Sequence, residues 1–368
     1  MHEKKTPLIR LAKRDAMPAR QVWCIRAGSF VAAILLGGLI FLLIGNNPFT
    51  AYATILSGSL GKKTAIRQTV KIAIPLLGTA LAIAPCFKMR FWNIGAEGQV
   101  LAGGLACATC MICLRDVFPN WLIILCMIVS SIAVGAIWAA IPGFFKARWN
   151  TNETLFTLMM NYIATQLVAY FVIVWEVPKG AGKIGIINQS SGIGWLPQIG
   201  GYRYLLSIVV VAVLTVLMYI YLNYSKHGYE IAVVGESERT ARYVGINVQR
   251  VIVRTMLLSG AVCGVAGLLL VGSTEHTLTT TLADGRGFTA VMVSWLAKFN
   301  PIFMIFTSFL LVLLNRGASE ISTDFGLNQS FADILTGIIL FCIIGSEFFI
   351  NYQIHFRRSA KKEGEAHV

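Results

Sequence analysis

Long apolar runs without charged residues recur along the chain, separated by short polar stretches. Five of them are long enough to cross a hydrocarbon layer about 30 Å thick, which takes roughly 20 helical residues. These runs cover residues 27–45, 119–141, 155–175, 204–224 and 255–274. Shorter apolar runs cover residues 72–87, 98–114, 287–297, 301–314 and 334–346. The pattern predicts an all-α polytopic membrane protein with about ten transmembrane helices, in which the 287–297 segment is short and either broken or re-entrant.

The composition agrees with this prediction. Hydrophobic residues make up 56% of the chain and charged residues only 13%, whereas soluble domains have about 45–50% and about 25%. The excess of apolar residues would cover the surface of a soluble fold. An ordinary cytosolic enzyme and a disordered chain are therefore both excluded.

The net charge of +14 is explained by membrane topology. With the N-terminus inside and ten spans, 21 of the 31 Lys and Arg residues fall on the cytoplasmic side, as the positive-inside rule requires. We therefore expect a basic cytoplasmic segment at 1–26, a transmembrane domain at 27–350 and a cytoplasmic tail at 351–368. Attraction to anionic membrane lipid is a secondary effect. The basic residues are dispersed and accompany no nucleic-acid-binding motif, so nucleic acid is not an expected partner.

Three polar stretches connect the predicted spans. Residues 46–66 and the glycine-rich residues 176–203 are expected outside, and residues 225–250 inside. The apolar positions of the inside stretch fit two short amphipathic helices broken near Gly235. A segment of this size is suited to lie on the membrane surface and contact a partner.

The most informative polar stretch is Phe91–Gln99, with the sequence FWNIGAEGQ, at the cytoplasmic start of a span. An ionisable group at membrane depth is costly and usually faces the protein interior or a water-filled cavity. Glu97 is therefore a candidate for gating or positioning, for direct substrate contact, or for capping a helix start. Asn93 and Gln99 supply amides, and Trp92 an aromatic face, that would line or gate a pathway.

A second polar set follows at Asn150–Glu153. Asn152 or Thr151 can cap the next helix, and Glu153 suits its first turn. Asn161 lies about two turns deeper, where an unpaired amide would be costly. Asn161 therefore either bonds another helix or lines a pathway. The charged group at 284–287 is expected near the outer face, as solvated loop charge, an entrance or a docking point.

Other chemistry is not evident in the sequence. Cys107, Cys110 and Cys113 have metal-like spacing, but no fourth ligand follows, so helix packing is favoured and no metal or cofactor is expected. Gly58–Thr64 lacks the spacing of a phosphate loop. No catalytic set can be assembled, so the chain is not expected to be an enzyme, and any ATP must be bound by another subunit. Gly260-x-x-x-Gly264 and the glycines at 98, 103, 104 and 267 predict close helix approach.

Three motifs resemble one family. FWNIGAEGQ (91–99), NETLFTLMMNYIA (152–164) and VVGESERTARYVGINVQRVIV (233–253) resemble the inner-membrane permease subunits of ABC importers for branched-chain amino acids, monosaccharides and nucleosides. The nucleoside and simple-sugar permeases are the most similar group. The resemblance covers most of residues 65–350.

The resemblance implies a type II ABC importer fold in a bacterial cell membrane. It also implies three partners: a second permease subunit, two cytoplasmic ATPase subunits and an extracytoplasmic substrate-binding lipoprotein. The inside loop would carry the coupling helix that meets the ATPase. By position in this sequence, that helix comprises Gly235, Glu236, Arg239, Arg242, Tyr243 and Gly245.

The cargo implied is a small polar solute, most consistently a nucleoside, with a monosaccharide or a branched-chain amino acid as alternatives. Residues 284–301 depart from the usual sequence of the family and include the bulky side chains of Trp295 and Phe299. An alternative of another class is an ion-coupled secondary transporter with Glu97 as its ion site.

Overall fold

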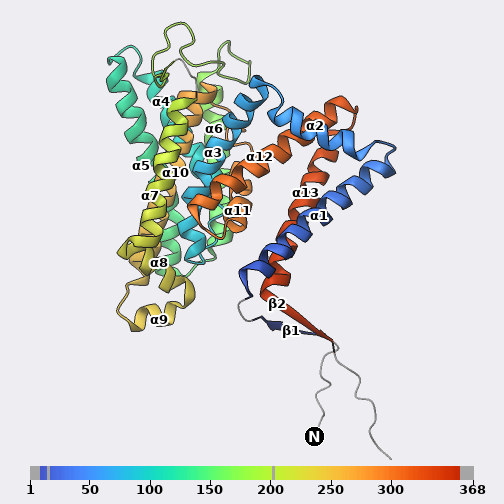
Figure 1. Ribbon diagram of the computed structural model, residues 1–368. Coiled ribbons are helices and arrows are strands. Elements are labelled where there is room, and N and C mark those ends of the chain that lie inside the picture. The colour runs from blue at the N-terminus through green and yellow to red at the C-terminus, as the bar shows by residue number, and fades with distance from the viewer. Residues whose placement is uncertain (1–8, 15–16, 201–203, 357–368) are drawn as a thin grey trace, which may run out of the picture. The chain divides into compact units, whose positions relative to one another are not determined.

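The computed structural model describes residues 9–14, 17–200 and 204–356, and nearly all of its regular structure is helical (Figure 1). The helices are α1 (Ala19–Leu43), α2 (Pro48–Leu60), α3 (Lys63–Lys88), α4 (Ala96–Cys113), α5 (Asn120–Trp149), α6 (Glu153–Trp175), α7 (Leu205–Tyr224), α8 (Lys226–Glu236), α9 (Glu238–Tyr243), α10 (Val248–Leu269), the π-helix η1 (Leu270–Glu275), α11 (Arg286–Leu296), α12 (Pro301–Asp324) and α13 (Gln329–Asn351). Two strands, β1 (Ile9–Lys13) and β2 (Tyr352–Phe356), complete the described elements.

Within the described residues, eight helices are long and apolar enough to cross a membrane. They coincide with α1, α3, α4, α5, α6, α7, the continuous α10–η1 helix, and α12. A shorter apolar stretch, Ile334–Ile350, lies in α13. The prediction of an all-helical polytopic membrane protein is confirmed, apart from the small β-ribbon, which the sequence pattern did not indicate.

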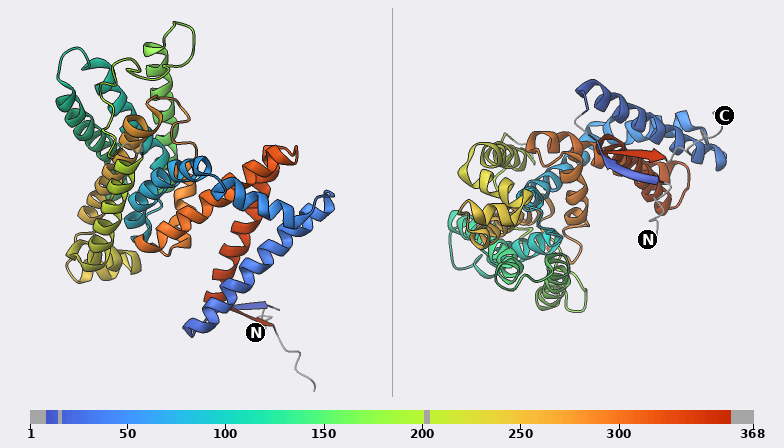
Figure 2. Two further views of the ribbon diagram at one scale, coloured as in Figure 1. Left: turned by 45° about the horizontal axis from the view of Figure 1, so that its top comes forward. Right: turned by 90° about the horizontal axis from the view of Figure 1, so that it is seen from below.

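Backbone contacts divide the chain into two units. The smaller unit contains residues 1–61 and 314–368, and the larger contains residues 62–313. In the smaller unit α1 packs against α13, and β1 pairs antiparallel with β2, so that Ile9 lies opposite Phe356. The two strands are the blue and red arrows in Figure 2. The predicted outside loop at 46–66 contains the helix α2, whose first turn is capped by the Asn47 side chain.

Glycines set the packing of the larger unit. The helices α5 and α10 form its most extensive contact. A Cβ atom on Gly260 would lie 2.1 Å from the Gly135 carbonyl oxygen, and one on Gly264 would lie 2.1 Å from the Ser131 carbonyl oxygen. A Cβ atom on Gly103 of α4 would lie 2.6 Å from the Gly264 Cα atom. The predicted close approach of helices at these glycines is confirmed, since no larger residue fits.

The segment after η1 forms the short piece expected from the sequence. The His276 carbonyl oxygen accepts a 2.8 Å hydrogen bond from the backbone N–H of Ile187, in the 176–200 loop. Residues 277–285 then continue without a regular helix, and α11 follows with only 11 residues. At 1.5 Å per residue α11 is about 16 Å long, roughly half of a hydrocarbon core. This predicted membrane segment is therefore broken.

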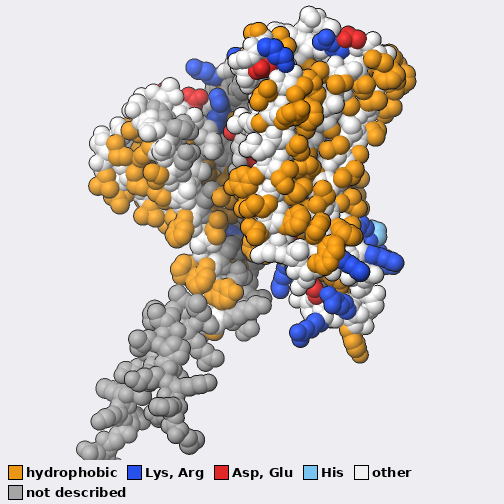
Figure 3. Space-filling view, turned by 180° about the vertical axis from the view of Figure 1, so that it is seen from behind, with side chains coloured by type: hydrophobic (Ala, Val, Ile, Leu, Met, Phe, Trp, Pro, Cys, Tyr) orange, Lys and Arg blue, Asp and Glu red, His pale blue; other side chains and the backbone are white. Residues whose placement is uncertain are grey.

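The inside stretch forms two short helices, as predicted. α8 and α9 are separated at Ser237, whose side chain caps α9 by accepting a hydrogen bond from the Thr240 N–H. Figure 3 shows hydrophobic side chains covering the larger unit between a charged upper end and a lower end rich in Lys and Arg. Such an apolar band between polar ends is the surface expected of a membrane-spanning body.

Candidate functional site

A tight turn connects α3 to α4 and carries the predicted site residues Trp92 and Asn93, while Glu97 and Gln99 follow in the first turn of α4. The turn begins where Arg90 adopts a positive φ of 60°, and the Phe91 N–H donates back to the Cys86 carbonyl. Phe91 and Asn93 are buried, whereas Trp92 is 45% exposed. The turn thus places alternate side chains inside the larger unit and on its surface.

Asn93 is the centre of a buried hydrogen-bond network. Its Nδ2 donates to Ser259 Oγ on α10 at 3.1 Å, and its Oδ1 accepts from the Gly95 N–H at 3.0 Å and from Gln99 Nε2 at 3.2 Å. Both amides are almost completely buried. In the described structure, Gln99 Oε1 has no hydrogen-bond partner. A buried polar network of this kind rigidifies its surroundings, so it fixes the start of α4 against α10.

Asn161 attaches the same turn to α6. Its Oδ1 accepts from the Gly98 N–H at 2.8 Å, and its Nδ2 donates to the Ile94 carbonyl at 2.9 Å. Thr157, one turn earlier on α6, accepts from the Ile94 N–H at 3.2 Å. Of the two interpretations left open by the sequence, the structure shows that Asn161 bonds another helix.

Glu97 holds the N-terminus of α11. Its Oε1 accepts from the Gly285 N–H at 2.9 Å, and its Oε2 accepts from the Gly287 N–H at 2.7 Å. A carboxylate is favoured at a helix N-terminus because the first N–H groups have no partner within the helix. A side chain at 287 would collide with Glu97, since a Cβ atom there would lie 2.4 Å from the Glu97 nitrogen.

This arrangement corrects one prediction. Residues 284–287 were expected near the outer face, as loop charge or an entrance. Instead, Gly285 and Gly287 contact Glu97 in the first turn of α4, close to the Phe91 turn. The reason is that residues 277–285 run inward alongside α4, where Leu282 lies against Gly104.

Glu153 is held by an ion pair. Its Oε2 lies 2.9 Å from Lys146 Nζ, and this contact joins the end of α5 to the start of α6. Asn152 caps α6, as predicted, by accepting from the Leu155 N–H. These residues form the short connection between the two helices.

Trp92 belongs to an aromatic cluster that the sequence pattern only partly indicated. It stacks on Trp295 of α11, with ring centroids 5.6 Å apart and planes inclined by 30°. Phe87 and Phe299 complete the cluster, and their rings are stacked 6.4 Å apart. Trp92 and Trp295 are each almost half exposed. The cluster therefore packs the C-terminal end of α11 against the Phe91 turn. It also presents an exposed aromatic surface.

The predicted coupling residues lie on or beside α8 and α9. Gly235 is buried against α3, because a Cβ atom there would lie 2.2 Å from the Lys88 carbonyl oxygen. The other members are exposed: Glu236, Arg239, Arg242, Tyr243 and Gly245. A cavity of about 50 Å³ is lined by Glu238 and Val234 on one side and by Arg90 and Phe91 on the other. The α8–α9 segment therefore contacts the same turn that carries the Asn93 network.

The sequence interpretation missed Ser259 and Thr157, and it did not connect Gly285 and Gly287 with Glu97. Ser259 and Thr157 are small polar residues inside apolar runs, and burial of their hydroxyl groups requires a partner. That requirement was the signal available for them. The two glycines flank Arg286, and only the path of the chain shows which carboxylate they meet.

Comparison with known proteins places this arrangement in context. The family described as "Branched-chain amino acid transport system / permease component" matches residues 66–344. The match contains the Phe91 turn, the α8–α9 segment and α11.

Individual relatives cover nearly the whole chain. The guanosine ABC transporter permease protein NupP of Bacillus subtilis is 29% identical over 91% of this chain and 96% of its own length. The nucleoside ABC transporter permease protein NupB of Lactococcus lactis is 27% identical over 92% and 96%. The glucose ABC transporter permease protein TsgB13 of Haloferax volcanii is 25% identical over 94% and 93%.

Proposed function

The chain belongs to the family of permease components of branched-chain amino acid transport systems, and we propose that it forms the translocation pathway of an ATP-driven nucleoside importer. The observation that carries the choice of cargo is that two relatives named for guanosine or nucleosides align with more than nine tenths of the chain. ATP is bound and hydrolysed by a separate cytoplasmic subunit. A second permease subunit and an extracytoplasmic binding lipoprotein complete the transporter.

In this proposal α9 is the coupling helix. Its exposed Arg239, Arg242 and Tyr243 are available to an ATPase, while Gly235 packs directly on the end of α3. Closure of the ATPase dimer changes the pore only if its contacts with α9 differ between the two states. The displacement of α8–α9 is passed to the Phe91 turn that it touches.

The Phe91 turn then acts on α11 at two points. Glu97 holds the first residues of α11 through two backbone hydrogen bonds, and Trp92 holds its last turn through the Trp295 stack. Because both ends of α11 are held in this way, the turn and α11 move together, and Asn93 and Asn161 connect the turn to α10 and α6. In this scheme Asn93, Gln99, Glu153 and Asn161 position the gate and Glu97 controls it.

The exposed faces of Trp92 and Trp295 suit a nucleobase. Base–aromatic stacking contributes roughly 1–3 kcal/mol and tolerates different bases, so one surface serves purine and pyrimidine nucleosides. A monosaccharide is the second candidate cargo, because the glucose permease relative covers 94% of the chain.

The test is uptake by the reconstituted transporter. The chain is copurified with its ATPase and second permease, placed in liposomes loaded with ATP, and given the binding lipoprotein with radiolabelled guanosine. We expect ATP-dependent uptake that excess uridine or adenosine suppresses and that excess glucose or leucine leaves unchanged.

Controls separate the alternatives. Uptake that stops without ATP, and that persists with a protonophore and without a sodium gradient, excludes coupling to protons or sodium. Suppression by glucose alone would contradict the nucleoside proposal and support the sugar. Replacement of Trp295 by Leu should weaken nucleoside uptake, whereas the same replacement of Trp121, an exposed residue at the start of α5, should not.

A further inference from the structure

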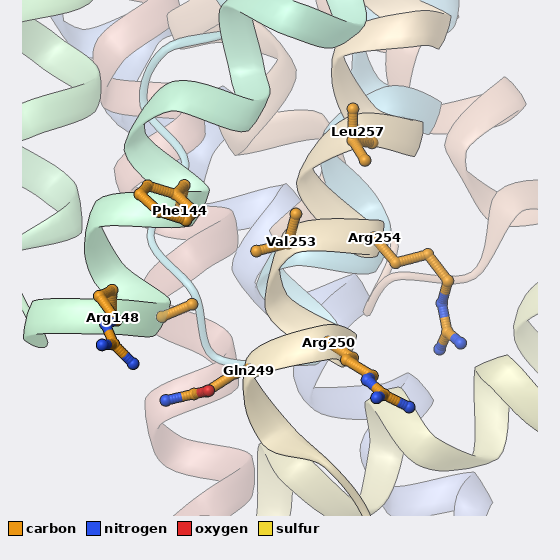
Figure 4. Close-up of a pocket in the computed structure, with 8 residues that line it drawn as sticks. Phe144, Arg148, Gln249, Arg250, Val253, Arg254 and Leu257 are labelled. Atoms are coloured by element: carbon orange, nitrogen blue, oxygen red, sulfur yellow. The ribbon is translucent and has the colours of Figure 1, made fainter.

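A pocket unrelated to the Asn93 network opens between the end of α5 and the start of α10 (Figure 4). Its volume is about 560 Å³. The lining residues are Phe144, Ala147, Arg148, Gln249, Arg250, Val253, Arg254 and Leu257. None of them bonds Asn93, Glu97 or Asn161 in the described structure, so the pocket is a separate site on the larger unit.

The charged and apolar lining residues are separated along the helix axes. On α5, Phe144 precedes Arg148 by one turn and lies deeper in the span. On α10, Val253 and Leu257 follow Arg250 and also lie deeper, Leu257 by seven residues or about 10 Å. Figure 4 shows the guanidinium groups at one end and the apolar side chains above them.

Two of the three guanidinium groups are available for a ligand. Arg254 donates to Glu230 Oε2 at 2.8 Å, and this hydrogen bond holds the pKa of Glu230 below its usual range. Arg148 and Arg250 are exposed, and in the described structure neither side chain has an acidic partner. No acidic residue lines the pocket. Its charged end is therefore complementary to an anion.

The surroundings place this end at the boundary between membrane and cytoplasm. Arg148 is followed by Trp149, which is 60% exposed, and Phe144 is 52% exposed. Aromatic side chains concentrate at this level of a bilayer, and Lys and Arg concentrate on its cytoplasmic side. The cytoplasmic leaflet carries anionic lipids that attract such groups.

We propose that the α5–α10 pocket is a binding site for an anionic phospholipid of the cytoplasmic leaflet. Arg148 and Arg250 bind the phosphate, and Arg can do so with two parallel N–H donors. Phe144, Val253 and Leu257 contact the first methylene groups of an acyl chain. A soluble phosphate would use the charged end but would leave this apolar wall uncovered. This site is independent of the cargo.

The experiment measures lipid retention by native mass spectrometry. The full chain, with the subunits that copurify, is titrated in detergent with phosphatidylglycerol and with phosphatidylcholine of identical acyl chains. We expect phosphatidylglycerol to be retained preferentially. The double variant Arg148→Gln/Arg250→Gln should bind it roughly tenfold to thirtyfold more weakly, as expected for two basic residues at a membrane surface.

Matched variants make the result specific. Lys226→Gln/Arg67→Gln also removes two exposed positive charges, but outside the pocket, and should bind phosphatidylglycerol like the original chain. Ala147→Phe fills the pocket without changing charge and should weaken binding as the double variant does. Glycerol 3-phosphate, which has the phosphate without acyl chains, should not displace the lipid at millimolar concentration.

Three outcomes would overturn the proposal. Equal retention of the two lipids would show that charge does not select the ligand. Displacement by glycerol 3-phosphate would identify the site as one for a soluble phosphate. Unchanged lipid binding in the double variant, together with loss of the copurifying ATPase, would make the pocket a docking surface for that subunit.

Discussion

Glu97 shows how one side chain connects segments nearly 190 residues apart. Both of its carboxylate oxygens are used by backbone N–H groups that begin α11. Hydrogen bonds to charged groups contribute about 1.5–3 kcal/mol each, and here they replace the helical partners that the first turn of α11 lacks. Asn93 and Asn161 perform the corresponding task for the start of α4.

Replacement of Glu97 by Gln tests this assignment. The amide keeps the size but has a single acceptor oxygen, so one N–H of α11 loses its partner. We expect at least a fivefold loss of uptake. The reason is that the α11 position held by Glu97 loses roughly 1 kcal/mol or more of stabilisation when one hydrogen bond is removed. The measurement is initial uptake rate together with ATPase rate in liposomes.

Glu176 provides a matched control. It also accepts hydrogen bonds from two glycine N–H groups, of Gly180 and Gly182, each at 2.8 Å, but in the 176–200 loop. Glu176→Gln should unfold at a similar temperature to Glu97→Gln. Normal uptake by Glu97→Gln would remove Glu97 from the gate.

At the scale of elements, the 18 residues of the α8–α9 pair contain an anchored helix followed by an exposed helix. α8 is anchored by Gly235 on α3 and by the Glu230–Arg254 ion pair on α10. α9 is short, capped by Ser237, and exposes almost all of its side chains. An anchored helix followed by an exposed one can transmit a displacement, because the first cannot slide independently of the helices it packs on.

Charge reversal on α9 tests this element. Arg239→Glu/Arg242→Glu changes two exposed side chains, of which Arg242 forms an ion pair with Glu238. We expect the fold and assembly to persist while uptake falls by an order of magnitude or more, since rim charge repulsion costs several kcal/mol. Uptake and basal ATPase activity of the purified complex are measured together.

Two further variants complete this test. Lys226→Glu, on the exposed side of α8, is the control for charge alone. Glu236→Pro interrupts the α8–α9 boundary, and a Glu236→Pro transporter that assembles should hydrolyse ATP without uptake. Normal transport by that variant would place the coupling helix elsewhere.

At the scale of the whole molecule, hydrophobic runs alone predicted the helical class and most spans. They did so because α5, α6, α7 and the α10–η1 helix each contain a mostly apolar stretch of about 20 residues without a charged side chain. The spacing of Gly260 and Gly264 predicted a close helix approach, and the structure identifies Ser131 of α5 as the residue that Gly264 approaches. The partners of Glu97 did not follow, because Gly285 reaches it only through the non-helical path of residues 277–285. The β1–β2 ribbon was also missed, since its strands lie at opposite ends of the sequence.

The ribbon leads to a topology prediction. Because β1 pairs with β2, the segments that precede α1 and follow α13 lie on the same side of the smaller unit. The basic residues before α1 place this side in the cytoplasm. A green fluorescent protein fused after the last residue should therefore fluoresce, and alkaline phosphatase at the same position should be inactive. The reverse result would contradict the cytoplasmic position of the ribbon.

The broken segment between η1 and α11 has a consequence for biogenesis. A membrane helix normally leaves the translocation channel because its own residues are apolar enough and its backbone hydrogen bonds are internal. Residues 277–285 do not meet the second condition, and α11 covers only half of the bilayer. This part of the chain therefore has no stable position in lipid until α3 and α4 are folded to receive it. We therefore expect its insertion to be a late step of assembly that depends on the contacts of Glu97, a residue synthesised long before this segment.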